Sequence, residues 1–441
     1  MKFPDFKGKK VLIMGLGLLG RGTGDAKFFA QRGAKVTVTD LKTEKELAPS
    51  IKELEKYPII FVLGRHREED FKKQDLIIRG AVVPRDSKFL QIAKENNIPV
   101  EMDESLFAKH CPCPIIGITG TRGKTTTTTI IYEILKKAGQ KVFLGGNLPG
   151  LATLPLIDQV EKDSVVVLEL SSWQLQGFAE AKISPQYAVF TNIYPDHLDK
   201  YRDMAEYIED KKAILKFQKE TDYLFLNSDD FLVSKFHRET KAKVIWFSPR
   251  DVTTDFSVNL MGAHNLSNLA AAIKVASVLG IDSRIIKNAV SEFKGVPGRL
   301  ELIKEINEIK FINDTTSTTP TSTEMALETF RGQNIILIVG GADKNLDFDG
   351  LAKKAVASVK KIVFLNGSAT ARLKNSLIKA GLSADQDLGD FDNLNEAVKT
   401  AFAEATAGDL ILFSPACASF GMFNNEYQRG ECFSKIVTNL S

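Results

Sequence analysis

The sequence is poor in cysteine and has no long apolar run, and both absences limit what the protein can be. The four cysteines are Cys111, Cys113, Cys417 and Cys432. Their spacing matches neither a disulfide framework nor a zinc site, so we interpret the Cys-Pro-Cys pair as a loop feature. Residues 1–10 carry charges and a proline where a secretory signal needs an apolar core. No apolar run reaches membrane-spanning length. We therefore expect a cytoplasmic protein that does not enter a membrane.

The net charge is small as well. At +3 over 441 residues it gives no reason to expect a nucleic-acid-binding surface. With 44% hydrophobic and 26% charged residues, the chain has the composition of a soluble globular protein and enough apolar side chains for several cores. The length predicts about three domains of ordinary size.

A phosphate-binding loop is the most informative stretch of the chain. The apolar run 114–118 leads into Gly-Thr-Arg-Gly-Lys-Thr-Thr at 120–126, and a helical pattern follows to Ala138. In a strand–loop–helix of this kind, backbone N–H groups and the helix N-terminus bind phosphate oxygens. Lys124 would reach the β- and γ-phosphates, and the Thr125 hydroxyl would bind Mg²⁺. The common form of the motif has glycine at position 118, where this chain has Ile118. A glycine-rich turn with a chance Lys-Thr is the alternative.

A second glycine loop, Gly-Leu-Gly-Leu-Leu-Gly at 15–20, lies between the predicted strands 11–15 and 35–40. Asp40 ends the second strand, where dinucleotide-binding folds place an acid that binds ribose. The motif specifies a pyrophosphate at a helix N-terminus, and so any diphosphate-linked nucleotide would satisfy it. A tight turn of purely structural purpose is the alternative.

Apolar runs and helical patterns alternate along the whole chain, which predicts an α/β fold with parallel sheets. We expect three domains: a Rossmann-like domain at 1–109, a central P-loop domain with a mostly parallel sheet at 110–296, and a Rossmann-like domain at 297–441. A linker is predicted at 107–114, and a hairpin turning at 307–308 opens the third domain. No internal repeat is present.

Several polar residues follow predicted strands, at the rim where open α/β sheets bind ligands. Glu169 ends a buried strand and would be costly there unless it were paired or bound to a metal. His197 lies in a second such position, as a ligand or as an ordinary turn histidine. Asn265 and Asn268 lie on one helix face suited to a base or a ribose. Lys344 follows a strand of the third domain and could receive a carboxylate.

Ten motifs in this order resemble the Mur ligase family, and they cover essentially the full length. Besides the two glycine loops they are G-G-N at 145–147, L-E-L-S-S-W-Q-L at 168–175, D-H-L-D at 196–199, H-N-L-S-N at 264–268, G-R-L-E at 298–301, N-D-T at 313–315, G-G-A-D-K at 340–344 and S-P-A-C-A-S-F at 414–420. The first and the last motif favour the branch that adds D-glutamate to UDP-N-acetylmuramoyl-L-alanine.

The resemblance implies an ATP-dependent carbon–nitrogen ligase of peptidoglycan synthesis, which we expect to be a monomer. It uses ATP and two Mg²⁺ ions, with an acyl phosphate as intermediate. The implied catalytic residues are Lys124, Glu169, His197 and Lys211, and the implied metal ligands are Thr125, Glu169, His197 and Lys211. The implied ATP-binding residues are Gly120, Thr121, Arg122, Gly123, Lys124, Thr125, Thr126, Asn265, Asn268, Arg299 and Asp314. UDP-substrate binding is implied for Gly17, Leu18, Leu19, Asp40, Lys42, Asn147, Ser171 and Gln174, and amino-acid binding for Thr318, Lys344, Ser419 and Phe420.

Lys211 matches the lysine that this family carbamylates. Lys212 is the competing choice, one position further and roughly 100° around a helix. We favour Lys211 because the family's lysine precedes an apolar residue by three positions, as Lys211 precedes Ile214. The alternative is that both lysines are solvated surface residues.

Three departures from the family pattern stand out. Gly298 replaces a frequent histidine before Arg299, residues 314–319 replace D-S-K-A-T-N, and Arg79 begins an R-G-A-V stretch in place of S-P-G. The last two departures concern stretches that the resemblance links to amino-acid and UDP recognition.

Three rival functions stay open on the sequence alone. A sibling ligase would add another amino acid, such as L-glutamate or a diamino acid. An NAD-dependent oxidoreductase would use the first glycine loop, but this leaves Lys124, Glu169 and His197 without a role. A nucleotide switch would bind ATP without turnover.

Overall fold

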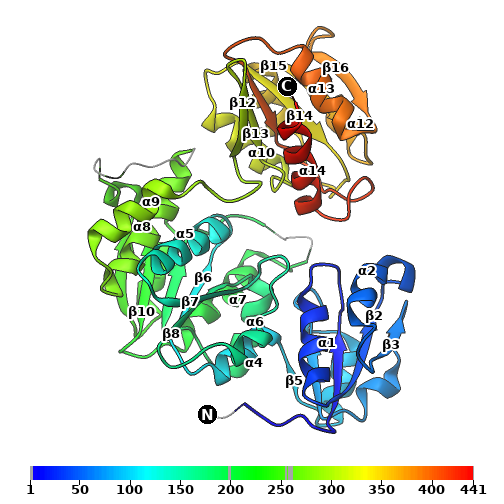
Figure 1. Ribbon diagram of the computed structural model, residues 1–441, viewed down its shortest axis with the longest axis vertical. Helices are drawn as coiled ribbons and strands as arrows, with labels where there is room; N and C mark the ends of the chain where they lie inside the picture. Colours follow the sequence, from blue (N-terminus) through cyan, green and yellow to red (C-terminus); the bar gives the residue numbers. More distant parts are fainter. Residues whose placement is uncertain (1–2, 197–199, 254–255, 257–261, 441) are drawn as a thin grey trace. The chain divides into compact units, whose positions relative to one another are not determined.

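A computed structural model describes residues 3–196, 200–253, 256 and 262–440. Within these ranges the chain forms three β-sheets with helices beside each of them (Figure 1). The predicted α/β class with three sheets is confirmed. Among the described residues no helix is both long and apolar enough to cross a membrane.

The first sheet has five parallel strands in the order β3-β2-β1-β4-β5. These strands are β1 (Lys10–Met14), β2 (Lys35–Asp40), β3 (Ile60–Leu63), β4 (Leu76–Arg79) and β5 (Val100–Glu101). The helices between them are α1 (Arg21–Gln31), α2 (Glu44–Leu54), the 3₁₀ turn η1 (Glu68–Phe71) and α3 (Lys88–Glu95). Strands β1 and β4 are almost entirely buried, which explains why both read as continuous apolar runs.

The second sheet has six parallel strands in the order β11-β10-β9-β6-β8-β7. They are β6 (Ile115–Thr119), β7 (Lys141–Gly146), β8 (Ser164–Glu169), β9 (Tyr187–Phe190), β10 (Tyr223–Asn227) and β11 (Lys243–Phe247). The helices are α4 (Asp103–His110), α5 (Lys124–Lys137), α6 (Ser172–Ala181), α7 (Met204–Lys216), α8 (Ala263–Val278) and α9 (Ser283–Glu292), with 3₁₀ turns η2 (Leu154–Asp158), η3 (Val233–Arg238) and η4 (Pro249–Asp251). Strand β6 lies in the interior of this sheet, with β9 on one side and β8 on the other.

The third sheet has the order β12-β13-β17-β14-β15-β16. Its strands are β12 (Glu301–Ile306), β13 (Ile309–Asn313), β14 (Ile335–Gly340), β15 (Val359–Leu365), β16 (Asp387–Phe391) and β17 (Leu410–Phe413), and its helices are α10 (Pro320–Thr329), α11 (Asp349–Ser358), α12 (Thr370–Lys379), α13 (Leu394–Ala403) and α14 (Glu426–Thr438). Only the β12–β13 pair is antiparallel. Asn307 and Glu308 both have positive φ in the turn between them, as the predicted hairpin requires.

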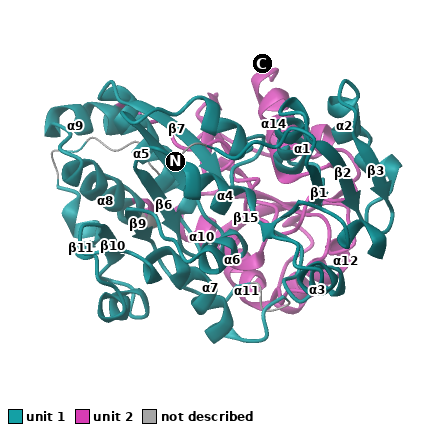
Figure 2. Cartoon of the chain, turned by 90° about the horizontal axis from the view of Figure 1, so that it is seen from below, with its two compact units in different colours: residues 1–257, 266–291 teal, residues 258–265, 292–441 magenta. Residues whose placement is uncertain are grey.

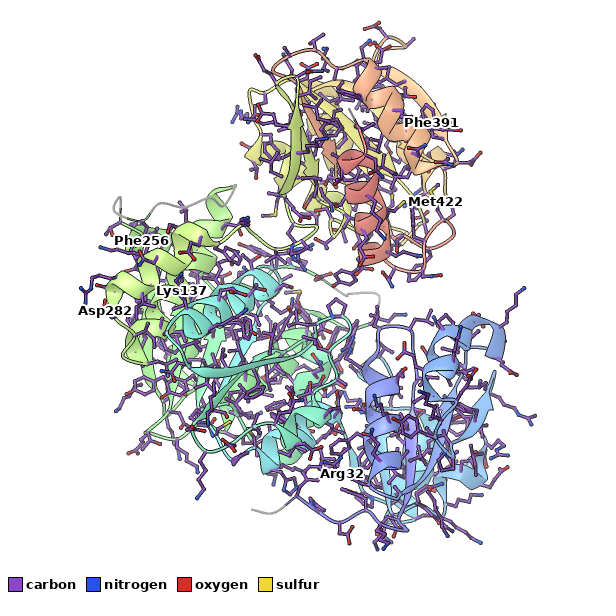
Figure 3. The ribbon with its side chains drawn as sticks, viewed as in Figure 1. Arg32, Lys137, Phe256, Asp282, Phe391 and Met422 are labelled. Atoms are coloured by element: carbon purple, nitrogen blue, oxygen red, sulfur yellow. The ribbon has the colours of Figure 1, made fainter. Side chains whose placement is uncertain are left out.

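The chain packs as two compact units, residues 1–257 with 266–291 and residues 258–265 with 292–441 (Figure 2). The first unit holds the first two sheets. One core cluster contains buried side chains from both sheets, and a smaller cluster that includes Leu12, Phe71 and Ile77 is separate from it. Arg32 in the turn after α1 contributes here by stacking on Phe28, 3.5 Å from its ring centre, and by pairing with Asp158 of η2 (Figure 3). The second unit has a separate core on each face of its sheet. The domain boundaries predicted from sequence stay predictions.

The predicted linker at 107–114 is wrong in its first half. Helix α4 continues to His110, and Phe107 is fully buried in the core of the first unit. Tertiary packing of this apolar residue extends the helix where the prolines at 112 and 114 suggested a loop.

Candidate active site

The phosphate loop runs from the end of β6 into α5. Gly120 and Gly123 both have positive φ, and Gly123 is the N-cap of α5. A Cβ at Gly120 would clash with the Thr191 hydroxyl, and one at Gly123 would clash with the Asn268 side chain. Both glycines are therefore required by their backbone conformation and by close neighbours. The Nζ of Lys124 donates to the carbonyls of Gly120 and Thr121 at 3.0 Å each.

Two residues after β9 brace this loop. The carbonyl of Asn192 accepts from the N–H of Thr121 at 3.0 Å, and its side-chain Oδ1 accepts from the N–H of Arg122 at 2.8 Å. The hydroxyl of Thr191 donates to the carbonyl of Arg122 at 2.7 Å. The loop is thus held by its neighbouring strand. Thr125 and the buried Thr126 follow in the first turn of α5.

Glu169 ends β8, directly opposite Ile118 of β6. Its Oε1 accepts from the side-chain amide of Asn147 at 3.0 Å, while its Oε2 is buried and has no hydrogen-bond partner among the residues that the structure describes. A buried carboxylate oxygen without a partner is costly, and a cation would satisfy it. This carboxylate beside a phosphate loop therefore fits Mg²⁺.

Lys211 lies on α7 with only 1% of its surface exposed. Its Nζ donates to the carbonyl of Gly120 at 2.9 Å, the same carbonyl that Lys124 contacts. Burial, and next the charge of Lys124, hold the pKa of Lys211 well below its usual value. Lys212 instead contacts Glu239 at 2.7 Å. The two lysines thus differ in surroundings as well as in direction. His197 lies outside the described residues.

The first glycine loop is tied to Asp40. One carboxylate oxygen of Asp40 accepts from the N–H groups of Leu16 and Gly17 at 2.8 and 3.1 Å, and the other accepts from the N–H of Lys42 at 2.9 Å. The hydroxyl of Ser50 donates to the carbonyl of Gly17 at 2.7 Å. The carboxylate therefore fixes the loop conformation, whatever ligand the loop binds.

The first glycine loop also touches the segment that follows β7. The N–H of Gly150 donates to the carbonyl of Leu19 at 3.0 Å, and a Cβ on Gly20 would lie 3.3 Å from the Cα of Gly150. Gly24, one turn into α1, faces Ala152 so closely that an added Cβ would clash with it. The two segments meet backbone to backbone.

Asn147 links the two sheets of the first unit. Its Oδ1 accepts from the guanidinium of Arg21 at 3.1 Å, and its backbone N–H donates to the carbonyl of Glu169 at 2.7 Å. A predicted substrate residue, a predicted metal ligand and the start of α1 are therefore joined in one chain of hydrogen bonds.

Ser171 and Gln174 form a capping box at the start of α6. The buried Gln174 also donates through Nε2 to Glu104 of α4. Burial, and then the neighbouring Asp103, raise the pKa of Glu104 well above its usual value. Both predicted substrate residues thus have structural partners, and no motif in the sequence pointed to Glu104.

Arg79 is an almost completely buried arginine at the end of β4, in the first unit. Its guanidinium donates to Oε1 of Gln176 at 3.0 Å, and Nε2 of Gln176 donates to Asp210 at 2.7 Å. Arg85 reaches the same Asp210 carboxylate at 3.2 Å. Asp210 immediately precedes Lys211, so the first sheet is connected to the helix that carries the buried lysine. The departure from the family pattern at Arg79 was the only signal in the sequence.

In the second unit, Asp314 is buried after β13. It accepts from the hydroxyl of Ser414 at 2.8 Å and from the N–H of Leu300 at 3.2 Å. Burial raises the pKa of Asp314 to about 6, against these hydrogen bonds and the charge of Arg299. Arg299 and Asp314, both predicted to bind ATP, therefore lie close enough to interact.

Lys344 and Thr318 are also brought together, with Nζ 3.0 Å from the threonine hydroxyl. Ser419 is buried, whereas Phe420 is 62% exposed. Sequence reasoning missed Arg429 of α14, which is buried and donates to the carbonyls of Thr315 and Cys417 at 2.8 and 3.2 Å. Arg429 thereby fixes the two loops on which Thr318 and Ser419 lie.

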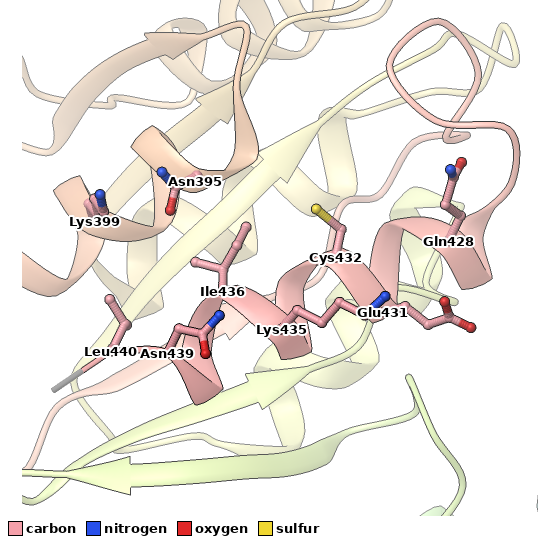
Figure 4. A pocket seen from close by; sticks show the side chains of 9 residues that line it. All are labelled: Asn395, Lys399, Gln428, Glu431, Cys432, Lys435, Ile436, Asn439 and Leu440. Carbon is pink, nitrogen blue, oxygen red and sulfur yellow. The ribbon is translucent and has the colours of Figure 1, made fainter.

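A separate groove of about 520 Å³ runs between α13 and α14 (Figure 4). No predicted site residue lines it. Its lining includes Lys399, Glu431, Cys432 and Lys435.

Comparison with known proteins gives consistent results over the whole chain. A model of the Mur ligase middle domain matches residues 118–256, and one of the Mur ligase glutamate ligase domain matches residues 298–417. The UDP-N-acetylmuramoylalanine–D-glutamate ligase of Roseiflexus sp. (strain RS-1) is 40% identical, covering 98% of this chain and 99% of that protein. The protein of the same name from Borreliella afzelii (strain PKo) is 39% identical over the full length of both. Among solved structures, UDP-N-acetylmuramate-alanine ligase from Thermotoga maritima shares the fold, with a TM-score of 0.64 at 19% identity over 98% of this chain and 99% of that one.

Proposed function

Since the chain belongs to the Mur ligase family, we propose that it adds D-glutamate to UDP-N-acetylmuramoyl-L-alanine with ATP, in cytoplasmic peptidoglycan precursor synthesis and as a monomer. The observation that carries the proposal is the convergence of Lys124 and Lys211 on the carbonyl of Gly120, beside the partly unsatisfied carboxylate of Glu169. Phosphoryl transfer needs this kind of concentrated charge. The names of the full-length relatives support the choice of substrates.

The UDP-sugar binds at the first glycine loop. Gly17, Leu18 and Leu19 present backbone groups to it, and Asp40 and Lys42 complete this site. The hydrogen bonds from the loop to Asp40 support this assignment, because they hold the N–H groups in a fixed arrangement before substrate arrives.

ATP phosphorylates the L-alanyl carboxylate, giving an acyl phosphate and ADP. The amine of D-glutamate then attacks the acyl carbon, and inorganic phosphate leaves. Lys124 stabilises the charge on the transferring phosphoryl group. Mg²⁺, when bound, neutralises phosphate charge, and Thr125, Glu169, His197 and carbamylated Lys211 would hold the two ions. Asn265, Asn268, Arg299 and Asp314 bind the rest of ATP.

Carbamylation of Lys211 joins the neutral amine to CO₂ and releases one proton, which leaves an anionic carbamate. The burial of Lys211 supports the modification, because a lowered pKa supplies the neutral amine. The nearby Lys124 ammonium then faces an anion instead of a second cation.

D-Glutamate binds in the second unit through Thr318, Lys344, Ser419 and Phe420. Lys344 pairs with one of its two carboxylates. The contact of Lys344 with Thr318 supports this role, since it positions the ammonium group without neutralising its charge.

Release of phosphate tests the function directly. With ATP, Mg²⁺ and UDP-N-acetylmuramoyl-L-alanine, we expect phosphate release with D-glutamate and not with L-glutamate, L-alanine or a diamino acid. Lys124→Ala should lower turnover about 10²- to 10³-fold. Lys137→Ala is the matched control, because Lys137 lies exposed at the other end of the same helix (Figure 3). Equal release with another amino acid would refute the substrate, and a folded, fully active Lys124→Ala protein would refute the role of the loop.

A further inference from the structure

Two cysteines that have no role in the proposed reaction lie next to each other. The Sγ atoms of Cys111 and Cys113 are 3.4 Å apart, in the short segment that joins α4 to β6. Cys111 is partly exposed, whereas Cys113 is buried. One thiol of the pair can therefore be reached from solvent and the other is sheltered behind it.

We propose that Cys111 and Cys113 form a reversible dithiol–disulfide site, in which Cys111 reacts with a peroxide and Cys113 resolves the product.

The fold itself holds the two sulfur atoms close together. The N–H of Cys111 donates to the carbonyl of Phe107 at 2.9 Å, which fixes one end of the segment to α4. At the other end, the N–H of Ile115 donates to the side chain of Gln186 at 2.9 Å. Pro112 between the cysteines has a restricted φ. A disulfide needs the sulfur atoms to approach from 3.4 Å to about 2.0 Å, a small movement for two side chains.

The two thiols differ in reactivity in the direction that the proposal needs. The hydrogen bond with the Cys113 thiol lowers the pKa of Cys111, against its partial burial. The same contact, and then burial, raise the pKa of Cys113. Cys111 is therefore the better thiolate and the nucleophile, while Cys113 stays protonated until a sulfenic acid forms beside it.

The reaction balances with hydrogen peroxide as the oxidant. The Cys111 thiolate attacks one peroxide oxygen, which breaks the O–O bond and gives a sulfenic acid and hydroxide. The Cys113 sulfur then attacks the sulfenic sulfur, and the second oxygen leaves as water. Overall, two thiols and one peroxide give one disulfide and two waters. A ring closed across a single residue is strained, so thiols of the cell can reduce it again.

The consequence is protection of an exposed thiol. A sulfenic acid without a partner is oxidised further to sulfinic acid, which thiols do not reverse. A resolving cysteine at 3.4 Å traps the oxidation at the reversible stage.

Graded peroxide treatment of the full-length protein, followed by peptide mapping, tests the proposal. We expect the titratable thiols, counted after denaturation, to fall from four to two. The peptide that contains both cysteines should lose two hydrogens in mass, and dithiothreitol should restore it. With dimedone, which labels sulfenic acids, Cys113→Ser should give a strong adduct at Cys111 and the wild type little or none. Cys113→Ala is the second variant if the serine is not tolerated at this buried position.

The other two cysteines serve as internal controls. Cys417 is buried, and burial raises its pKa to about 12. Cys432 lines the groove between α13 and α14, and burial raises its pKa as well. Sulfinic acid at Cys111 beside an intact Cys113 thiol would overturn the proposal. Oxidation confined to Cys432 or to disulfides between molecules would also overturn it.

Discussion

Replacement of Arg79 by methionine should destabilise the first unit more than any surface substitution. The guanidinium donates to Oε1 of Gln176, to the carbonyl of Val83 at 3.2 Å and to the sulfur of Met102 at 3.1 Å. It also lies 3.5 Å from the Glu180 carboxylate. Arg79→Met leaves these buried acceptors without their donor and keeps most of the side-chain volume. Each unsatisfied buried acceptor costs about 1–3 kcal/mol.

Part of this loss is offset. Burial of the guanidinium is itself unfavourable, as the lowered pKa of Arg79 indicates, and methionine removes that cost. Asp210 also keeps Gln176 and Arg85 as partners. We therefore expect the free energy of unfolding to fall by about 2–3 kcal/mol.

Arg85→Met is the matched control. Its side chain is 43% exposed and pairs with Glu206 at 2.8 Å and with Asp210 at 3.2 Å. Ion pairs exposed to this degree contribute about 0–1 kcal/mol. The pair of variants therefore separates burial from charge, since each removes one arginine bound to the same network.

Urea denaturation followed by tryptophan fluorescence measures the difference, because both tryptophans, Trp173 and Trp246, belong to the first unit. A decrease below 1 kcal/mol for Arg79→Met, or an equal decrease for Arg85→Met, would refute the reasoning. Because Asp210 precedes Lys211, we also expect the turnover of Arg79→Met to fall. Turnover is measured without urea, at a temperature at which the variant is folded.

Four further site residues are tested by substitution, with Lys212→Ala as the control for Lys211→Ala. Lys211→Ala should nearly abolish phosphate release, whereas Lys212→Ala should leave most of it. Equal effects of the two variants would contradict the assignment. Removal of CO₂ and bicarbonate should reversibly lower wild-type turnover. The wild type should lose stability as the pH rises from about 4 to 6, because the folded-state pKa of Asp314, about 6, exceeds its unfolded value near 4. The native state binds more protons in that window, and its free energy of unfolding falls by about 2–3 kcal/mol across it. Asp314→Asn should abolish this pH dependence. Calorimetry between pH 4 and 7 checks this, and an unchanged slope would count against it. Lys344→Ala should raise the KM for D-glutamate about ten-fold or more and leave the KM for ATP unchanged. Asp40→Ala should raise the KM for the UDP-substrate by a similar factor, and a rise confined to ATP would reverse the assignment of the two glycine loops.

The sequence predicted the family and the three-sheet fold, and both predictions are confirmed. Strands such as β1, β6 and β14 are buried on both faces, so their sequences are continuous apolar runs that are easily identified. Strand β16 could not be predicted in this way, because Asp-Leu-Gly-Asp-Phe is a polar edge strand with an internal glycine.

Only those residues of the candidate site that belong to sequence motifs could be predicted. Glycine loops and strand-end acids have local signatures, and so Lys124 and Glu169 could be named in advance. The partners of Arg79 and Arg429 could not, because Gln176 and Thr315 are about a hundred positions away along the chain and only the fold brings them near. Burial of a cationic side chain leaves no periodic pattern in the sequence.

The backbone contact between the first glycine loop and the segment after β7 has a consequence for recombination. An added Cβ on Gly24 would clash with Ala152, and one on Gly20 would lie only 3.3 Å from the Cα of Gly150, so residues 20–24 leave little room here for larger side chains. Consider a hybrid enzyme that takes its first sheet from one relative and its second sheet from another. We expect it to pack poorly at this contact unless residues 146–152 and residues 15–24 come from the same relative. Over evolutionary time, the two segments are expected to be inherited as one piece.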